Sequence, residues 1–262
     1  MAVRPEGTPC WADASFDDPP AAQDFYGELL GWTFGESAEE YGGYTQASVD
    51  GELVAAISPK MPGSDEPTAW NLYFATPDAA ATAARIRENG GTLAEEPVQV
   101  GSFGTMVRAT DPSGVPFCAW QAADHQGFGR TGEPGAFVWA EVCTRDTRKA
   151  DAFFPVVFPF EVQRMVSDKV DFNVWKVAGA PVAGRLRMTA NFPEAADPFI
   201  NVYFAVSGVD DTVATAVRLG GQLLYGPTPS PFGRFAPLMD PQGAVFTVID
   251  TADTEGPMPS FD

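Results

Sequence analysis

The sequence predicts an α+β protein of four βαβββ units, which pair into two domains with curved, mixed sheets and helices on the outside. Two observations support this prediction. A segment of about fifty residues, 70–120, occurs a second time in the C-terminal half. In addition, each quarter of the chain shows the same order of a strand, an amphipathic helix and a ribbon of short strands separated by turn residues.

Matched residues in the two halves make the internal repeat visible. Asn71 and Asn201 each open a strand of the pattern Asn-x-Tyr-Phe-Ala, and they lie 130 residues apart. Asp111 and Asp240 each begin an Asp-Pro-x-Gly turn, and they lie 129 residues apart. Because such a repeat marks a duplicated structural unit, the 262 residues are expected to divide into two domains of ordinary size.

The expected boundaries follow from this duplication. We predict an N-terminal domain over residues 1–122, a polar, Gly-rich linker over 123–135, a C-terminal domain over 136–252 and a loose tail over 253–262. The sequence leaves open whether the units of one domain share a sheet or whether units pair across the two halves.

The first unit opens with a strand-like run at 10–16. Asp18 is then expected to cap a helix whose first turn holds two prolines. Apolar residues recur at helical spacing up to Leu30, and Gly31 ends the helix. Short strands are predicted to follow at 32–34, 44–49 and 53–57, with an Asp-Gly hairpin turn at 50–51.

The other units follow the same order. The second has a strand at 70–75, a helix from about 79 to 89, and strands near 92, at 104–109 and at 115–120. The third opens at 137–142, and Pro155 is expected to cut its helix short, since proline lacks an N–H and clashes with the preceding turn. The third unit is therefore predicted to be the most divergent, and the N-terminal cup the better preserved.

Composition excludes several classes of partner. The formal charge is −19, the pI is about 4.2 and only 16 side chains are basic, which opposes binding to nucleic acid or to anionic membranes. No apolar run approaches the length of a membrane span, and the N-terminus lacks the core of a signal peptide. The three cysteines are too scattered for a disulfide framework or a zinc site. We expect a cytoplasmic monomer or homodimer.

The chain resembles the vicinal oxygen chelate superfamily, which includes glyoxalase I, bleomycin-resistance proteins and extradiol dioxygenases. The resemblance rests on the Asp-initiated helix that ends in Phe-Tyr-x-x-Leu-x-Gly-Trp at 25–32, and on the Asp-Pro-x-Gly turns that precede a strand. It covers about residues 8–122 and 136–250. It implies that βαβββ modules pair into cups whose concave faces hold the ligand.

The resemblance also locates the positions that hold a metal ion in metal-dependent members. In this chain those positions are Trp11, Asn71, Cys118, Trp139, Asn201 and Thr247. Iron, zinc, nickel or manganese would need His, Glu or Gln there. The single histidine, His125, lies in the predicted linker and is interpreted as a solvated residue. We therefore expect no metal and no other cofactor.

Aromatic and polar side chains are expected to line the cups instead, because strand residues two apart share a face. The predicted catalytic residues are Asp13 and Glu141, and the predicted ligand-binding residues are Trp11, Asn71, Tyr73, Phe103, Cys118, Trp120, Trp139, Asn201, Tyr203, Phe232 and Thr247. Each has an alternative interpretation: the tryptophans and Cys118 as core, the asparagines as partners of the backbone, the carboxylates as facing solvent on an edge strand, and the two phenylalanines as core residues beside turn glycines.

Two functions fit these patterns. The first is a metal-independent protein that binds a hydrophobic or aromatic small molecule, in sequestration, resistance or transport. The second is a secondary-metabolism enzyme of the hydroxylase, isomerase or lyase type, in which Asp13 or Glu141 acts as general base. A third interpretation, a structural partner with no ligand, requires both cups to be filled by their own side chains.

Overall fold

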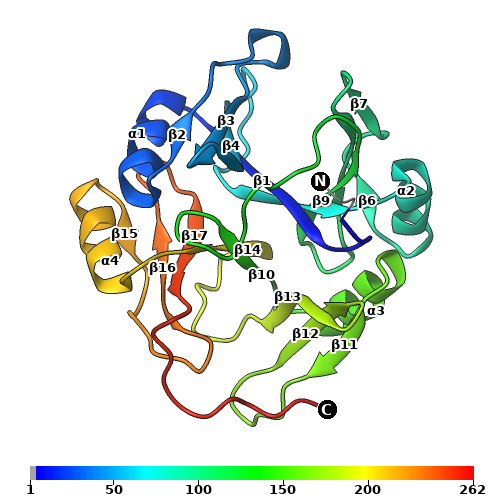
Figure 1. Ribbon diagram of the computed structural model, residues 1–262. Coiled ribbons are helices and arrows are strands. Elements are labelled where there is room, and N and C mark those ends of the chain that lie inside the picture. The colour runs from blue at the N-terminus through cyan, green and yellow to red at the C-terminus, as the bar shows by residue number, and fades with distance from the viewer. Residues whose placement is uncertain (1–3) are drawn as a thin grey trace.

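The structure, a computed structural model, describes residues 4–262 and contains two curved sheets with helices at their sides (Figure 1). The first half comprises β1 (Pro9–Phe16), α1 (Pro19–Leu30), β2 (Thr33–Phe34), the 3-10 helix η1 (Glu39–Tyr41), β3 (Thr45–Val49), β4 (Glu52–Pro59), β5 (Trp70–Ala75), α2 (Ala79–Glu88), β6 (Thr92–Leu93), β7 (Val98–Val100), β8 (Gly104–Thr110) and β9 (Pro116–Ala122). The second half comprises β10 (Phe137–Thr144), α3 (Thr147–Val157), β11 (Glu161–Arg164), β12 (Phe172–Val177), β13 (Ala180–Arg187), β14 (Phe199–Ala205), α4 (Val209–Arg218), β15 (Gln222–Leu223), β16 (Arg234–Met239) and β17 (Val245–Asp250).

Each half of the chain forms one mixed sheet. The strand order is β2-β3-β4-β1-β5-β9-β8-β6 in the first sheet, with β7 added beside β8, and β11-β12-β13-β10-β14-β17-β16-β15 in the second. Units one and two therefore share a sheet, as do units three and four, which the sequence left open. The predicted α+β class with curved, mixed sheets is confirmed.

The two sheets have the same register at their centres. In the antiparallel pair β1–β5, Trp11 lies opposite Tyr73 and Asp13 opposite Asn71. In β10–β14, the equivalent pairs are Trp139 with Tyr203 and Glu141 with Asn201. Since β1 and β10 are central strands, their carboxylates do not lie on an exposed edge, as one interpretation of the sequence supposed.

Helix ends largely follow the sequence. Asp18 and Asp78 accept hydrogen bonds from backbone N–H groups in the first turns of α1 and α2, and Gly31 adopts a left-handed conformation after α1. The expectation for Pro155 is wrong, because α3 continues past it to Val157. Pro155 lies in the last turn, where it removes a single helix bond, and the buried side chains around it hold that turn in the core.

A continuous aromatic core joins the faces of the two sheets that carry the helices. The ring of Phe204 on β14 packs 5.3 Å from Trp32 and 5.2 Å from Trp70 of the first half. The ring of Phe74 on β5 packs 5.0 Å from Phe158, which follows α3. Helices pair across the halves at the two sides of this core, α1 with α4 and α2 with α3 (Figure 1). The opposite, concave faces therefore point away from each other.

The linker and the C-terminal tail are bonded to the sheets. In the linker, Phe128 N–H donates to the carbonyl of Cys10 at 2.7 Å and Gly129 N–H donates to that of Leu53 at 2.7 Å. The tail bonds to loop residue Ser230 on one side of the second sheet and pairs with Arg164 of the opposite edge strand. It runs along the side of the second sheet that faces away from the first (Figure 1). The expectation of a loose tail is therefore wrong.

Within residues 4–262, no helix combines the length and the apolar character that a membrane span requires.

Removal of one hydroxyl group in the core should weaken the contact between the halves. Tyr26 donates to Asp240 of the second half at 2.8 Å and accepts from Trp70 at 3.0 Å, so both partners lose a buried bond in Tyr26→Phe. We expect chemical denaturation to show a loss of about 1–3 kcal/mol in unfolding free energy. Tyr225→Phe, at an exposed position, should change that energy by less than about 0.5 kcal/mol. Equal effects of the two variants would contradict this prediction.

Candidate functional site

The concave face of the first sheet is organised around the carboxylate of Asp13. This carboxylate accepts hydrogen bonds from the hydroxyls of Tyr73 at 2.8 Å and Tyr44 at 3.0 Å, and from the amide of Asn71 at 3.0 Å. Trp11 joins this network as a fifth residue, since its indole N–H donates to the Tyr44 oxygen at 2.6 Å. Burial raises the pKa of Asp13 above its usual range, and the three hydrogen bonds to the carboxylate act against that rise.

The linker covers this face. The His125 ring stands edge-on to Trp11, with 4.5 Å between ring centroids, and lies 5.9 Å from the Trp120 ring. Trp120 donates its indole N–H to the backbone carbonyl of His125 at 2.9 Å. Burial lowers the His125 pKa to about 4, so the ring is neutral near pH 7. The interpretation of His125 as a solvated residue is therefore wrong.

The predicted ligand-binding residues of the first sheet are consequently buried. Trp11, Asp13, Tyr73, Cys118 and Trp120 are each 8% exposed or less, and Asn71 is half-buried. Each contacts another side chain of the same row or the linker. The side chains of the chain itself therefore fill the first cup. This is what we expect of a cup that has a structural role and binds no ligand.

The equivalent row of the second sheet is more open at Trp139 and Glu141, whereas Asn201, Tyr203 and Thr247 are each 8% exposed or less. Trp139 and Glu141 are half-buried there, and Glu141 accepts one short hydrogen bond, from the Tyr203 hydroxyl at 2.8 Å. The Asn201 amide turns away from the carboxylate and exchanges hydrogen bonds with the Thr247 hydroxyl at 2.9 and 3.2 Å. Burial raises the pKa of Glu141 to about 7, against the hydrogen bonds from Tyr203 and Trp139.

One substitution between the repeats explains much of this difference. Phe172 stands 128 residues after Tyr44, at the start of the equivalent strand, and it has no hydroxyl to donate to Glu141. Its ring instead packs over Gly184, where an added Cβ would lie 2.5 Å from the ring. Sequence reasoning missed Tyr44 as a site residue, because Tyr44 lies just before β3, which is separated from β1 by β4, and only the strand order of the sheet brings it near Asp13.

The rims of the cups differ as well. In the first cup, Phe103 packs 5.5 Å from the ring of Tyr41 in η1, so the two opposite edges of the sheet touch. In the second cup, the equivalent Phe232 is 42% exposed and Tyr225 is 55% exposed. Tyr225 lies near enough for Glu141 to raise the pKa of its phenol, after the larger effect of burial. The interpretation of the two phenylalanines as core residues is wrong, because Phe103 is also 40% exposed.

The residues at the metal positions of the resemblance do not form a donor set for a transition metal. Asn201 and Thr247 are bonded to each other, Asn71 donates its amide to Asp13, and burial raises the pKa of the Cys118 thiol, which opposes the thiolate form. Among residues 4–262, no three His, Cys, Asp or Glu side chains are grouped so that they could hold a metal ion.

Comparison with known proteins decides the family. A sequence model of the Glyoxalase/Bleomycin resistance protein/Dioxygenase superfamily matches residues 11–119. The anthracycline biosynthesis protein DnrV of Streptomyces peucetius is 36% identical over 258 residues, covering 93% of each chain. The chain belongs to the glyoxalase/bleomycin resistance/dioxygenase superfamily. The putative glyoxylase CFP32 of Mycobacterium tuberculosis is also 36% identical, over 94% of this chain and 96% of that protein.

Solved structures of this superfamily share the fold. The 2,3-dioxygenase LapB from Pseudomonas sp. KL28 aligns with a TM-score of 0.66 and 14% identity, over 99% of this chain and 95% of that chain. The Mn(II)-bound glyoxalase from Novosphingobium aromaticivorans aligns with a TM-score of 0.63 and 18% identity, over 97% and 89%. At these identities the likeness shows a shared fold and no more.

The two carboxylates should differ in their contribution to stability. Asp13→Ala leaves three donors without an acceptor, the buried Tyr73 and the half-buried Tyr44 and Asn71, so we expect a loss of about 3 kcal/mol in unfolding free energy. Glu141→Ala removes the acceptor of the hydrogen bonds from Tyr203 and Trp139 at a half-buried position and should cost about 1 kcal/mol. Denaturant titrations of both variants test this, and an equal or larger loss for Glu141→Ala would contradict the assignment of Asp13 as a structural hub.

Glu141 should titrate close to neutrality. Carboxyl NMR of protein labelled at glutamate should show one resonance with a midpoint near pH 7, absent in Glu141→Gln and present in the exposed control Glu133→Gln. Because the folded pKa lies above the unfolded value of 4.5, the folded state binds more protons between about pH 4.5 and 7. Stability should therefore fall with rising pH across this window, and less so in Glu141→Gln. A Glu141 midpoint near 4.5 would contradict the prediction.

Proposed function

We propose that the chain binds a hydrophobic, aromatic small molecule on the concave face of the second sheet, without a metal ion held by its side chains. One observation carries this proposal: the row of Trp139 and Glu141 is half-open, whereas the equivalent row of Trp11 and Asp13 is buried. A surface with aromatic walls and few polar groups suits an aromatic ligand.

The rim of the second cup adds to this support. Phe232 and Tyr225 are exposed there, and exposed aromatic side chains that surround a concave surface are typical of binding sites. Tyr203 fixes the Glu141 carboxylate on the floor, so that one polar group faces a largely apolar ligand. Two relatives, DnrV and DauV, are named for anthracycline biosynthesis, which supports a polycyclic aromatic ligand.

A second candidate function is an enzyme in which Glu141 acts as general base. Its supporting observation is the Glu141 pKa of about 7, since a base with a pKa near the working pH is both ionised and able to accept a proton. In an isomerase or lyase step, the Glu141 carboxylate would take a proton from the ligand, and the hydrogen bond from Tyr203 would hold the carboxylate in position. Asp13 is a weaker candidate for this role, because three donors already occupy its oxygens.

Matched phenylalanines at the two rims test the binding site. Titration with an anthracycline, followed by tryptophan fluorescence, should give saturable binding that survives treatment with EDTA. Phe232→Ala should weaken this binding roughly tenfold through loss of aromatic contact, and Phe103→Ala should leave it unchanged, because the two residues are equally exposed at equivalent positions. An equal effect of Phe103→Ala, or loss of binding with EDTA, would contradict the proposal.

Substitution of the carboxylate separates binding from catalysis. Glu141→Gln keeps the size of the side chain and removes the base. If the protein is an enzyme, turnover should fall while affinity stays, and the wild-type rate should rise with pH through about 7 as Glu141 ionises. Conversion of ligand at an unchanged rate by Glu141→Gln would exclude this role.

A further inference from the structure

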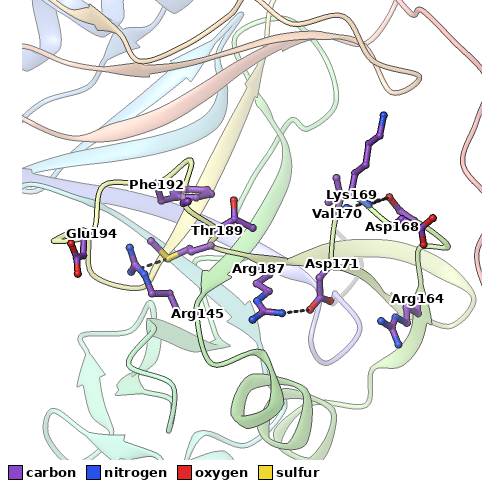
Figure 2. Close-up of a pocket in the computed structure, with 13 residues that line it drawn as sticks. Arg145, Arg164, Asp168, Lys169, Val170, Asp171, Arg187, Thr189, Phe192 and Glu194 are labelled. Carbon is purple, nitrogen blue, oxygen red and sulfur yellow. Dashed lines mark hydrogen bonds and ion pairs between the residues drawn. The ribbon is translucent and has the colours of Figure 1, made fainter.

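A hollow of about 710 Å³ lies at the end of the second sheet where β10 finishes. Figure 2 shows the residues that line it, which come from the position just after β10, from the end of β11 and the loop that follows it, and from the end of β13 and the connector that follows it. Its volume is within the range of about 300–1,000 Å³ that is usual for small-molecule pockets. None of the cup residues described above lines it.

Basic side chains gather in this hollow although the chain is strongly acidic. Four of its 16 basic residues line the hollow, namely Arg145, Arg164, Lys169 and Arg187. Three acidic residues also line it, so the lining carries one positive charge in excess within a chain of net charge −19. The local balance is thus opposite in sign to that of the whole protein.

Most of these cations lack a carboxylate partner. Ten of the 16 basic side chains form ion pairs within the described chain. The six without one, over residues 4–262, are Arg4, Arg145, Arg148, Arg164, Lys169 and Lys176. Half of these six line the hollow. The protein has 35 acidic residues, yet three cations without a carboxylate partner lie together in this hollow. This arrangement favours an anionic partner from outside the chain.

The guanidinium of Arg145 is held in place by neutral groups. It donates to the backbone carbonyls of Ala196 at 2.6 Å and Pro193 at 2.7 Å, which fix its position and leave its charge uncompensated. Arg187 lies 4.0 Å from the Asp171 carboxylate (Figure 2), which also accepts a much shorter bond of 2.6 Å from the buried Arg185. Guanidinium groups bind carboxylate and phosphate through paired, charge-assisted hydrogen bonds.

Apolar side chains complete the lining. Phe192 is half-buried beside Thr189, Met188 is buried beneath Arg145, and Val170 lies on the opposite loop (Figure 2). A bare inorganic ion would leave these groups unused. The lining therefore fits an anion that carries an apolar or aromatic body.

We propose that this hollow is a binding site for a small organic anion, a carboxylate or a phosphate monoester, separate from the aromatic cup. The positive charges of Arg145, Arg164, Lys169 and Arg187 around the hollow attract the anionic group, and Phe192 contacts the apolar body. The site does not depend on the function proposed for Glu141, and the two are tested with different compounds.

Calorimetric titration of the full chain with phenyl phosphate and with benzoate tests this site. The compound that binds more tightly shows whether the site prefers a phosphate or a carboxylate. We expect one site per chain with a dissociation constant of about 1 mM or lower. The double variant Arg164→Gln/Lys169→Gln should weaken binding by about tenfold or more, because it removes two of the four positive charges that line the hollow. Both positions are exposed, so the fold should be retained, and an unchanged melting temperature checks this.

The matched control removes the same charge elsewhere. Arg148→Gln/Lys176→Gln replaces two cations that also lack a carboxylate partner in the described chain but do not line the hollow, so affinity should change by less than about twofold. If this control lost as much affinity as the first variant, the effect would come from the net charge of the protein and not from the hollow, and the proposal would be overturned. Binding of neutral benzyl alcohol as tightly as the anions would also overturn it, as would the absence of binding by either anion.

Discussion

The aromatic packing between the two sheets is the constraint on which the rest of the structure depends. The ring of Phe204 packs against those of Trp32 and Trp70. Phe74, at the equivalent position of the first half, packs against Phe158. Rings of this size bury much apolar surface, so the helix-bearing faces of the two sheets are held together. Both concave faces must then point outward, so the side chains of each face are free to differ without disturbing this packing.

The concave faces of the two duplicated halves differ in their hydrogen bonds. Both keep a carboxylate, an asparagine, a tyrosine and a tryptophan in the same register, yet their hydrogen bonds differ. In the first half Tyr44 and Asn71 both donate to Asp13, and the linker covers the row. In the second half Phe172 stands at the position of Tyr44 and Asn201 bonds elsewhere, so Glu141 retains one short bond and a raised pKa. A satisfied carboxylate stabilises the fold, and a less satisfied one remains available to a ligand.

The same comparison separates architecture from chemistry in this superfamily. The chain shares its fold with a Mn(II)-bound glyoxalase and with dioxygenases, and at the positions expected for a metal Asn201 bonds to Thr247 and Asn71 bonds to Asp13. The basic hollow beyond β10 lies outside that cup, and its chemistry is that of charge rather than aromatic contact. A scaffold whose sheets are fixed by their cores can change its surfaces with little effect on stability.

The sequence alone determined the fold class and the repeat, because matched motifs and helix caps such as Asp18 act locally and leave a pattern along the chain. It also placed Trp11 with Asp13 and Trp139 with Glu141, since alternation along a strand is local. It misjudged His125, Pro155 and the tail, whose environments depend on packing and pairing with distant segments. Only the tertiary structure decided which cup stays open and where the unpaired cations meet, because strand pairing and linker packing join residues that lie far apart in the chain.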